Sequence, residues 1–372
     1  MRSWRETRPF DYVMLAAAVA LTCFGLILIY SGSINTMGTG LENLQGPTGR
    51  QMVFGILAVM VCLIVSRFDY RWLAQGSTLM YIGLILALIF VMTVHGTEEY
   101  GSRRWINVGP FHIQPSEIGK LVIILVLARY LSENQDNIND PRVFFSSLAL
   151  AGVPALLVFA EPDLGSASIF FFIWLGMVIM AGASMRLVLS TLGMGLAMLP
   201  FAVIAVITDY QRDRISLFLD PNKEALGDGF NILQAEISIG SGGFFGQGLT
   251  HGTQTQLDYL RTQTTDYVFS VLGEELGFIG AMLLFSLYIL LLFRGLRAAG
   301  MSQDVFGRLV AIGVVIFILF QTFINIAVNL RLFPVTGIPL PFISAGGSSL
   351  VTVFIAIGLL QSVVMRRNQV TL

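Results

Sequence analysis

The chain has 372 residues, of which 55% are hydrophobic and 12% are charged, and its formal net charge is −1. Because soluble domains carry roughly 25% charged residues, this composition excludes a soluble globular protein and indicates a chain that lies mostly within a membrane. The near-zero net charge provides no basic surface for nucleic acid, and the only two lysines, Lys120 and Lys223, argue against a polybasic arm for anionic lipids.

Ten apolar stretches approach the length of about 20 residues that a membrane-spanning helix needs. They cover residues 11–31, 50–66, 73–94, 117–132, 145–160, 164–183, 186–208, 266–293, 307–330 and 347–365. The sequence therefore predicts an all-α, polytopic integral membrane protein with about ten transmembrane helices in a single domain, residues 1–372. Cys23 and Cys62 lie inside these stretches, where we expect small buried side chains and no disulfide.

The basic residues predict the orientation of the chain. Ten spans place both termini on one side, and a cytoplasmic assignment puts more than half of the 22 basic residues inside, as the positive-inside rule favours. The basic segment Arg2–Arg8 before an uncleaved first span predicts a signal anchor. The polar segments 94–116, 161–163, 209–265 and 331–346 then lie on the outer face. The longest, the extracytoplasmic loop 209–265 between spans seven and eight, predicts short amphipathic helices lying partly on the membrane surface.

Ionisable residues within a membrane span are rare and usually functional. Glu117 and Lys120 lie three residues apart at the start of span four and can pair on one helix face. Either Ser116 caps this helix and the two charges neutralise each other there, or Lys120 is a fixed cation that suits a phosphate-bearing ligand. Asp163 lies at the start of span six and belongs to the same small set.

Asp266 lies where the polar loop passes into span eight, and two interpretations stay open. Aspartate is a favoured N-cap residue, but a carboxylate at the edge of a span is costly unless it has a function. Eight residues further on, Glu274 lies about 80° around the helix from Asp266, and Glu275 points nearly the opposite way. Only Glu274 could share a cavity with Asp266, and we expect both glutamates to hydrogen bond to neighbouring helices.

Other polar groups recur near the predicted outer ends of the spans. Gln321, Asn325 and Asn329 recur every four residues on one face of span nine, which favours contacts between helices. A glycine cluster in 240–248 lacks the Gly-Lys-Ser/Thr of a phosphate-binding loop and is a weak phosphate motif.

Four arginines on the predicted outer face could bind phosphate through two hydrogen bonds each, or could simply be solvated. They are Arg103, Arg104, Arg212 and Arg214. An outward-facing polar site with a carboxylate and cations fits two classes of protein: an enzyme acting on an amphiphilic phosphate-linked substrate, or a transporter that moves one.

Six motifs, in one order along nearly the whole chain, resemble the shape, elongation, division and sporulation (SEDS) family. They are Gly101–Asn107 (GSRRWIN), Gln114–Lys120 (QPSEIGK), Glu161–Ser166 (EPDLGS), Gln234–Gly248 (QAEISIGSGGFFGQG), Thr265–Phe269 (TDYVF) with Glu274–Gly277 (EELG), and Pro339–Ser344 (PLPFIS) with Gly346–Ser349 (GGSS). Two further segments, Gly252–Gln256 and Val335–Pro341, resemble the elongation members of the family more than the division members.

The resemblance implies a peptidoglycan glycosyltransferase of the bacterial cytoplasmic membrane. Such an enzyme polymerises lipid II at the outer leaflet and works with a class B penicillin-binding protein that crosslinks the product. Carried over by motif, the catalytic acid is Asp266, while Glu117, Lys120 and Asp163 are further cavity positions. Lys120 and one or more of the four arginines would then bind the lipid pyrophosphate, together with a divalent cation, Mg or Mn, held by a carboxylate. The alternatives are a lipid II flippase and a non-catalytic scaffold for the crosslinking partner.

Overall fold

The structure is a computed structural model that describes residues 10–37, 46–95, 97–99, 102–108, 111–205, 209–224, 228–260 and 262–367. Helices dominate these ranges, and seven of the described helices are long and apolar enough to cross a membrane. The chain is therefore a helical, polytopic membrane protein, which confirms the expectation from composition.

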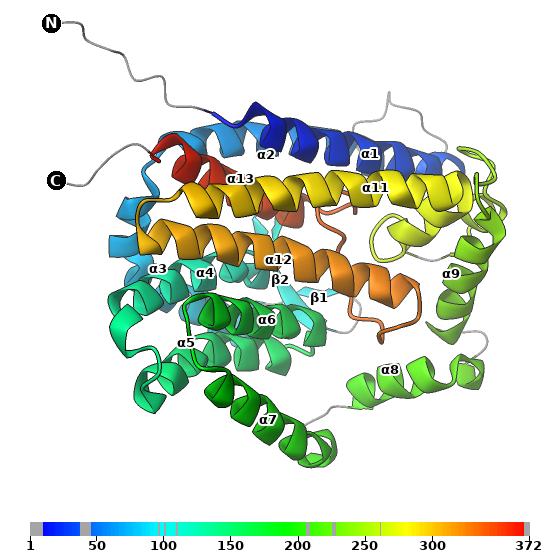
Figure 1. The fold of residues 1–372 in the computed structure, drawn as a ribbon. Coiled ribbons are helices and arrows are strands. Elements are labelled where there is room, and N and C mark those ends of the chain that lie inside the picture. The colour runs from blue at the N-terminus through cyan, green and yellow to red at the C-terminus, as the bar shows by residue number, and fades with distance from the viewer. Residues whose placement is uncertain are drawn as a thin grey trace, which may run out of the picture.

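Each of the ten apolar stretches forms a helix (Figure 1). These helices are α1 (Tyr12–Met37), α2 (Pro47–Arg67), α3 (Tyr70–Phe90), α4 (Pro115–Glu133), α5 (Pro141–Ala160), α6 (Leu164–Met180), α7 (Met185–Ala205), α11 (Val268–Met301), α12 (Val305–Asn329) and α13 (Gly347–Met365). Three fall outside the seven candidate spans. Helix α6 has 17 residues, the part of α7 whose side chains are described, Met185–Met198, is shorter than 18 residues, and α4 carries four charged residues.

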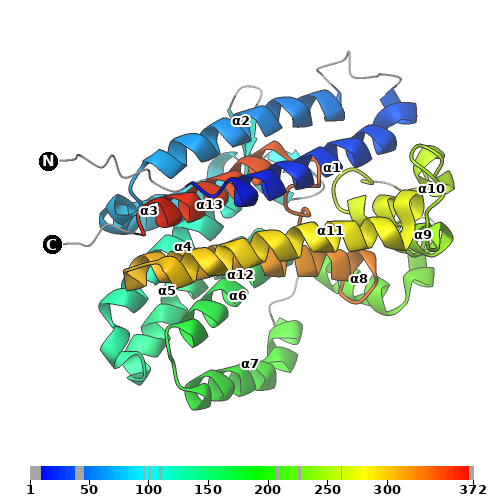
Figure 2. The ribbon, with the colours of Figure 1, turned by 45° about the horizontal axis from the view of Figure 1, so that its top comes forward.

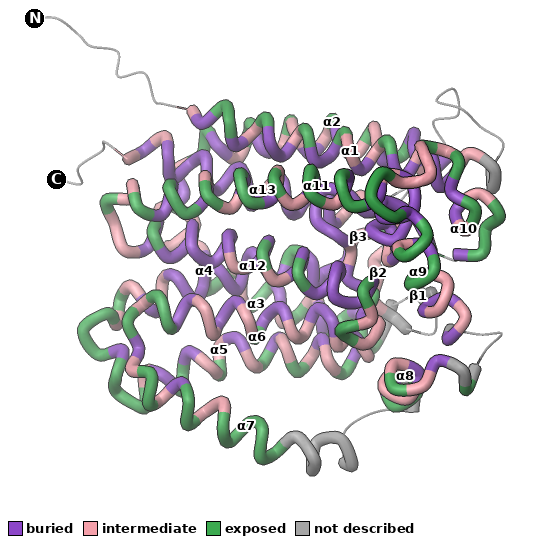
Figure 3. Tube along the Cα trace, turned by 45° about the vertical axis from the view of Figure 1, so that its right-hand side comes forward, coloured by how far each residue is buried: buried purple, intermediate pink, exposed green. Residues whose placement is uncertain are grey.

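The charged helix α4 lies at the centre of the bundle, together with α12 and α13. Most residues of these three helices are buried, whereas α2 and α3 bury only a narrow face each (Figure 3). Helix α7 lies at the edge of the bundle (Figure 2). The buried charged side chains of α4, Glu117 and Lys120, therefore sit in protein rather than in lipid, which is where membrane proteins tolerate them.

The polar segments gather at one end of the bundle. They form a short antiparallel sheet, β1 (Thr97–Glu99), β2 (Ser102–Val108) and β3 (Phe111–Ile113), and the short helices α8 (Asp209–Leu219), η3 (Pro221–Glu224), α9 (Asp228–Gly242) and α10 (Thr253–Gln256). The prediction of short helices in 209–265 is confirmed. Helix α1 begins and α13 ends at the opposite end of the bundle (Figure 1).

At that opposite end, a buried glutamine joins two helices. The side-chain amide of Gln361 on α13 donates to the carbonyl oxygen of Asp11 at 2.7 Å and accepts from its N–H at 3.0 Å. The Asp11 carboxylate in turn lies 2.6 Å from Arg294 on α11. These bonds join the start of α1 to two other helices.

Helix α11 is broken at Gly277, where φ is 61° and ψ is −155°. The break frees backbone groups that the glycine-rich turn after α9 satisfies. Gln247 N–H donates to the Glu274 carbonyl oxygen at 2.9 Å, and Phe278 N–H donates to the Gly243 carbonyl oxygen at 3.0 Å. In a membrane such groups need partners inside the protein. Two glycines of 240–248 have a packing role: a Cβ on Gly242 would lie 1.8 Å from the Gly273 carbonyl oxygen, and one on Gly246 would lie 2.2 Å from the Glu275 carbonyl oxygen.

We expect Gly277→Ala to destabilise the protein strongly. This backbone conformation is almost restricted to glycine and costs other residues about 1–3 kcal/mol, and the added Cβ would lie 2.4 Å from the Gly246 nitrogen. Thermal unfolding in detergent measures the loss. The control is Gly300→Ala in the same helix, where a Cβ meets no atom within 4 Å among the described residues. Equal melting temperatures for the two variants would contradict the prediction.

Candidate active site

Asp266 lies in the turn that precedes α11, and it is not the cap of that helix. The N-cap residue is Tyr267, and no side chain caps it. The backbone carbonyl of Asp266 accepts hydrogen bonds from the side-chain amides of Asn329 at 2.9 Å and Asn325 at 3.3 Å. Within the described part of the chain, no donor bonds its carboxylate. The N-cap interpretation is therefore wrong, and the carboxylate is available for chemistry.

The surroundings of Asp266 tune its acidity. Burial raises the pKa of this carboxyl, the positive charges of Arg214 and Arg104 lower it, and the negative charge of Asp163 raises it. The net direction is upward, so Asp266 is a stronger base than a solvated aspartate. A base of this kind suits removal of a proton from a hydroxyl near neutral pH.

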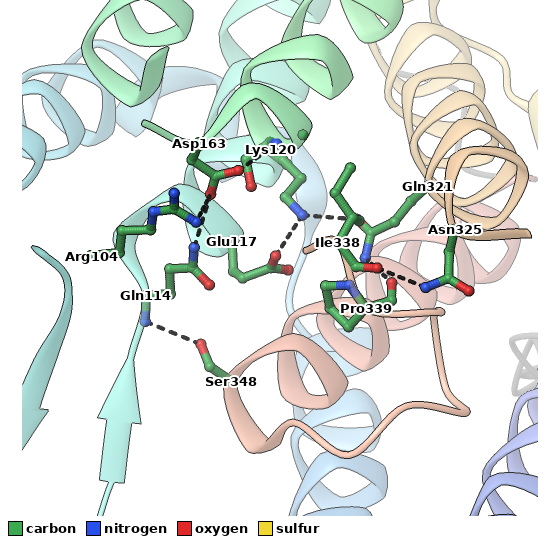
Figure 4. A network of polar contacts seen from close by, with 12 residues as sticks. Arg104, Gln114, Glu117, Lys120, Asp163, Gln321, Asn325, Ile338, Pro339 and Ser348 are labelled. Atoms are coloured by element: carbon green, nitrogen blue, oxygen red, sulfur yellow. Dashed lines mark hydrogen bonds and ion pairs between the residues drawn. The ribbon is translucent and has the colours of Figure 1, made fainter. Parts of the chain in front are cut away.

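Arg104 connects the β-sheet to the turn between α5 and α6 (Figure 4). Its guanidinium donates to the carbonyl oxygens of Glu161 at 2.9 Å and Pro162 at 2.5 Å, and it lies 3.9 Å from the Asp163 carboxylate. Asp163 also accepts from Ser166 N–H, which makes it the N-cap of α6, and from the Gln114 side chain at 3.2 Å. Arg104 and Asp163, both candidates from sequence, are thus brought together.

Glu117 and Lys120 form the buried ion pair that their spacing predicted. Lys120 Nζ donates to Glu117 Oε1 at 2.7 Å and to Gln321 Oε1 at 2.8 Å, and the lysine side chain is fully buried. Ser116 is not the cap of α4, because the N-cap residue is Gln114. The structure thus places Lys120 between α4 and α12 rather than at an open surface (Figure 4).

The polar stripe on α12 holds both the ion pair and the loop that follows this helix. Gln321 binds Lys120 and donates to the Pro339 carbonyl oxygen at 3.0 Å, and Asn325 donates to the Ile338 carbonyl oxygen at 2.8 Å. The prediction that this stripe joins neighbouring elements is confirmed. Gln321 and Asn325 are uncharged, so they hold Lys120 and the backbone of the loop in place without adding charge to the site.

The remaining candidates differ in where they lie. Arg214 on α8 donates to the Val335 carbonyl oxygen at 2.9 Å and is near enough to Asp266 to affect its pKa. Arg212 on the same helix is exposed. The backbone of Arg103 pairs with Glu98 in the sheet, but its side chain lies outside the described part of the structure.

The glutamates of α11 are structural. The Glu274 carboxylate accepts from the backbone N–H groups of Gln254 and Thr255 at the start of α10, at 2.7 and 3.1 Å. Glu275 accepts from Ser31 Oγ of α1 at 2.5 Å. The expected bonds to neighbouring elements are confirmed, and Glu274 is committed to α10.

Glu161 is a site residue that the sequence interpretation missed. It is buried beside Asp163 and Arg104, and among the described residues its Oε1 has no hydrogen-bond partner. Burial and the charge of Asp163 raise the pKa of Glu161 to about 8, against the opposing effect of Arg104. Its position two residues before Asp163 was the available signal.

The described residues contain no group of three or more His, Cys, Asp or Glu side chains arranged to hold a metal ion. The carboxylates of Asp163 and Glu161 both interact electrostatically with Arg104. A divalent cation here would have to take most of its ligands from pyrophosphate and water, as Mg²⁺ often does.

Comparison with known proteins places the chain in a family. The family model described as "Cell cycle protein" (FtsW, RodA, SpoVE) matches residues 11–369. A "Probable peptidoglycan glycosyltransferase FtsW" of Geobacter sp. (strain M18) is 36% identical over 97% of this chain and 98% of its own. The "Peptidoglycan glycosyltransferase MrdB" of Escherichia coli (strain K12) is 34% identical over 97% of this chain and 95% of its own.

Solved structures agree with this relationship. One, described as "Structural coordination of polymerization and crosslinking by a peptidoglycan synthase complex", has a TM-score of 0.81 at 29% identity and covers 98% of this chain and 100% of its own. The rod shape determining protein RodA of Thermus thermophilus has a TM-score of 0.71 at 26% identity, covering 99% and 100%. From its motifs, its helical bundle and these matches, the chain belongs to the FtsW/RodA/SpoVE family.

Proposed function

We propose that this protein is a peptidoglycan glycosyltransferase that polymerises lipid II into β-1,4 glycan strands, with Asp266 as the general base. The observation that carries the proposal is the Asp266 carboxylate, which has a raised pKa, no capping role and two arginines nearby. Relatives in the same family are named peptidoglycan glycosyltransferases, which supports the reaction class.

The proposed reaction needs one base. Asp266 takes the proton of the acceptor GlcNAc 4-hydroxyl, the oxygen attacks C1 of the donor sugar, and the bond from C1 to pyrophosphate breaks with inversion. Pyrophosphate leaves without a proton, so the second carboxyl that a glycosidase uses as an acid is not required.

Positive charge would stabilise the leaving pyrophosphate. We assign this role first to Arg104 and Arg214, which act on Asp266 electrostatically, and then to Arg212 and Arg103 on the same end of the bundle. Lys120 is buried in its ion pair with Glu117 and would add positive charge from inside the bundle. Asp163 holds the guanidinium of Arg104 in place. Mg²⁺ or Mn²⁺ bound to the pyrophosphate would add to the same charge.

The proposal includes an orientation and partners. The start of α1 and the end of α13 lie at the opposite end of the bundle from the site, which supports cytoplasmic termini and an extracytoplasmic site in a bacterial cytoplasmic membrane. Similarity to a structure described as part of a peptidoglycan synthase complex supports a class B penicillin-binding protein as partner. Segments 252–256 and 335–341 favour a role in cell elongation. Lipid II and membrane lipids complete the set of partners.

The experiment is incubation of the purified protein and its crosslinking partner with labelled lipid II, followed by separation of glycan chains on a gel. Polymer is the expected product. A flippase would instead move lipid II across a vesicle membrane without forming glycosidic bonds, and a scaffold would do neither. Absence of polymer from the complex would overturn the proposal.

We expect Arg214→Gln to move the acid limb of the pH profile of kcat/KM to higher pH. The base acts only when deprotonated, and Arg214 holds the pKa of Asp266 down. Without that charge the pKa rises, so activity is lost at a higher pH as the solution is acidified. Arg212→Gln on the same helix is the control, because Arg212 is exposed and is not among the charges that shift the Asp266 pKa, and its limb should stay in place. A limb that is unmoved in Arg214→Gln would count against Asp266 as the titrating base.

A further inference from the structure

Gln51 joins the outer helix α2 to the segment that precedes α13. Its side chain is buried on the narrow face of α2 that faces the protein. The amide nitrogen donates to the carbonyl oxygen of Ser344 at 3.1 Å, and the amide oxygen accepts from the N–H of Gly346 at 3.1 Å. One side chain therefore fixes the backbone on both sides of Ala345.

The segment that Gln51 holds is itself bonded to the turn that carries Asp266. Ser344 Oγ donates to the carbonyl oxygen of Thr265 at 2.5 Å and accepts from Leu340 N–H at 2.8 Å. The N–H of Ala345 donates to the carbonyl oxygen of Thr264 at 2.8 Å. Thr264 and Thr265 are the two residues before Asp266, so hydrogen bonds run without a gap from α2 to the catalytic turn.

Close packing leaves this segment little room to move. A Cβ on Gly347 would lie 2.5 Å from the Phe54 ring, which is one turn after Gln51 on α2. A Cβ on Gly25 of α1 would lie 2.6 Å from the backbone of Ile343. Closely packed side chains shift only together. Loss of the Gln51 hydrogen bonds should therefore displace the turn that carries Asp266 and not only the segment next to Gln51.

The turn is thus held from two directions. From one side, Asn325 and Asn329 of α12 bind the carbonyl of Asp266 itself. From the other, Gln51 acts through Ser344 and Ala345 on the two preceding carbonyls. Two separate anchors on consecutive residues define the direction in which the intervening side chain leaves the backbone.

We propose that Gln51 is a positioning residue for the reaction, which sets where the Asp266 carboxylate lies relative to the acceptor hydroxyl. This inference rests on the proposed function, because it assumes that Asp266 is the base. Misplacing a reacting group by about 1 Å can cost about 100-fold in rate. The effect should fall on kcat, because Gln51 touches neither the arginines nor the α4 ion pair among the described contacts.

Two substitutions of similar length test the role. Gln51→Met removes both hydrogen bonds, and Gln51→Glu keeps an acceptor for Gly346 N–H but loses the donor to Ser344. The control is Gln361→Met at the other end of the bundle, because Gln361 is an equally buried glutamine whose amide also makes two bonds to backbone. Each variant is purified with the crosslinking partner, its melting temperature is measured, and kcat and KM are determined with labelled lipid II.

We expect kcat to fall about 10- to 100-fold in Gln51→Met and less in Gln51→Glu, with KM within about threefold of the parent. Gln361→Met should lose a similar amount of thermal stability and keep its kcat. If Gln51→Met does not fold, Gln51→Glu carries the comparison. A kcat within twofold of the parent in a Gln51 variant, or an equal fall in Gln361→Met, would overturn the positioning role. Activity that survives in Asp266→Asn would instead overturn the proposed function.

Discussion

Asp266→Asn is expected to abolish polymerisation of lipid II without loss of folded protein. A positioned general base contributes about 10²- to 10⁴-fold to a rate, and the asparagine amide cannot accept the hydroxyl proton. The fold should tolerate the change, because the neighbours of Asp266 bind its backbone carbonyl and not its carboxylate. Removal of a partly buried charge should leave the melting temperature unchanged or slightly raised.

The measurement is a gel of glycan chains made by the complex, with Asp258→Asn as the matched control. Asp258 is exposed in the same loop and has a positive φ of 56°, a conformation that asparagine tolerates well. Full activity in the control and none in Asp266→Asn would identify the base. If folded Asp266→Asn protein made polymer at the parent rate, Asp266 would not be the base. If it made no polymer but still moved lipid II across a membrane, the flippase function would be favoured.

The second large effect is expected from Lys120. Lys120→Met leaves Glu117 buried without its cation, and breaking a buried ion pair in this way costs about 3–5 kcal/mol. The same change removes the donor that ties α4 to Gln321 on α12. We therefore expect a sharply lower melting temperature and a low yield of folded protein in detergent.

The double variant Glu117→Gln with Lys120→Met separates stability from charge. Replacing both partners removes the stranded carboxylate, so most of the lost stability should return. Its polymerisation should stay at least about tenfold below the parent, because the ammonium group that we assign to the pyrophosphate is lost, although the net charge of the pair is unchanged. If the free energy of unfolding of the single Lys120→Met variant were within about 1 kcal/mol of the parent value, the ion pair would be far less desolvated than its burial indicates.

Much of the fold can be predicted from the sequence, because every helix that crosses a bilayer needs an apolar stretch of about 20 residues. The ten apolar stretches become ten helices, and the three-residue spacing of Glu117 and Lys120 fixes their pairing before any neighbour is known. The stripe of Gln321, Asn325 and Asn329 was also predictable, since polar side chains on one face of a buried helix must find partners.

The parts that could not be predicted depend on contacts between distant segments. Gly277 lies in an apolar stretch and does not lower its hydropathy, so no local feature of the sequence predicts the break in α11. Gln51 and Ser344 lie almost 300 residues apart, and a single glutamine near the start of a span has no periodic pattern to reveal it. The burial of Glu161 could not be predicted, because Arg104, which lies beside it, comes from a segment 57 residues earlier in the chain. The strands of 97–113 are too short to show an alternating pattern.

The break in α11 also bears on the order in which the chain is built. The backbone groups exposed at Glu274 and Phe278 find partners in the glycine-rich turn at 243–247, which precedes them in the chain. This turn leaves the ribosome first, so its partner groups exist before the broken helix enters the lipid, where unpaired backbone is costly. A chain whose turn was deleted would present α11 to the bilayer with open hydrogen-bonding groups, and its defect would be seen as failed membrane insertion and degradation rather than as slow catalysis.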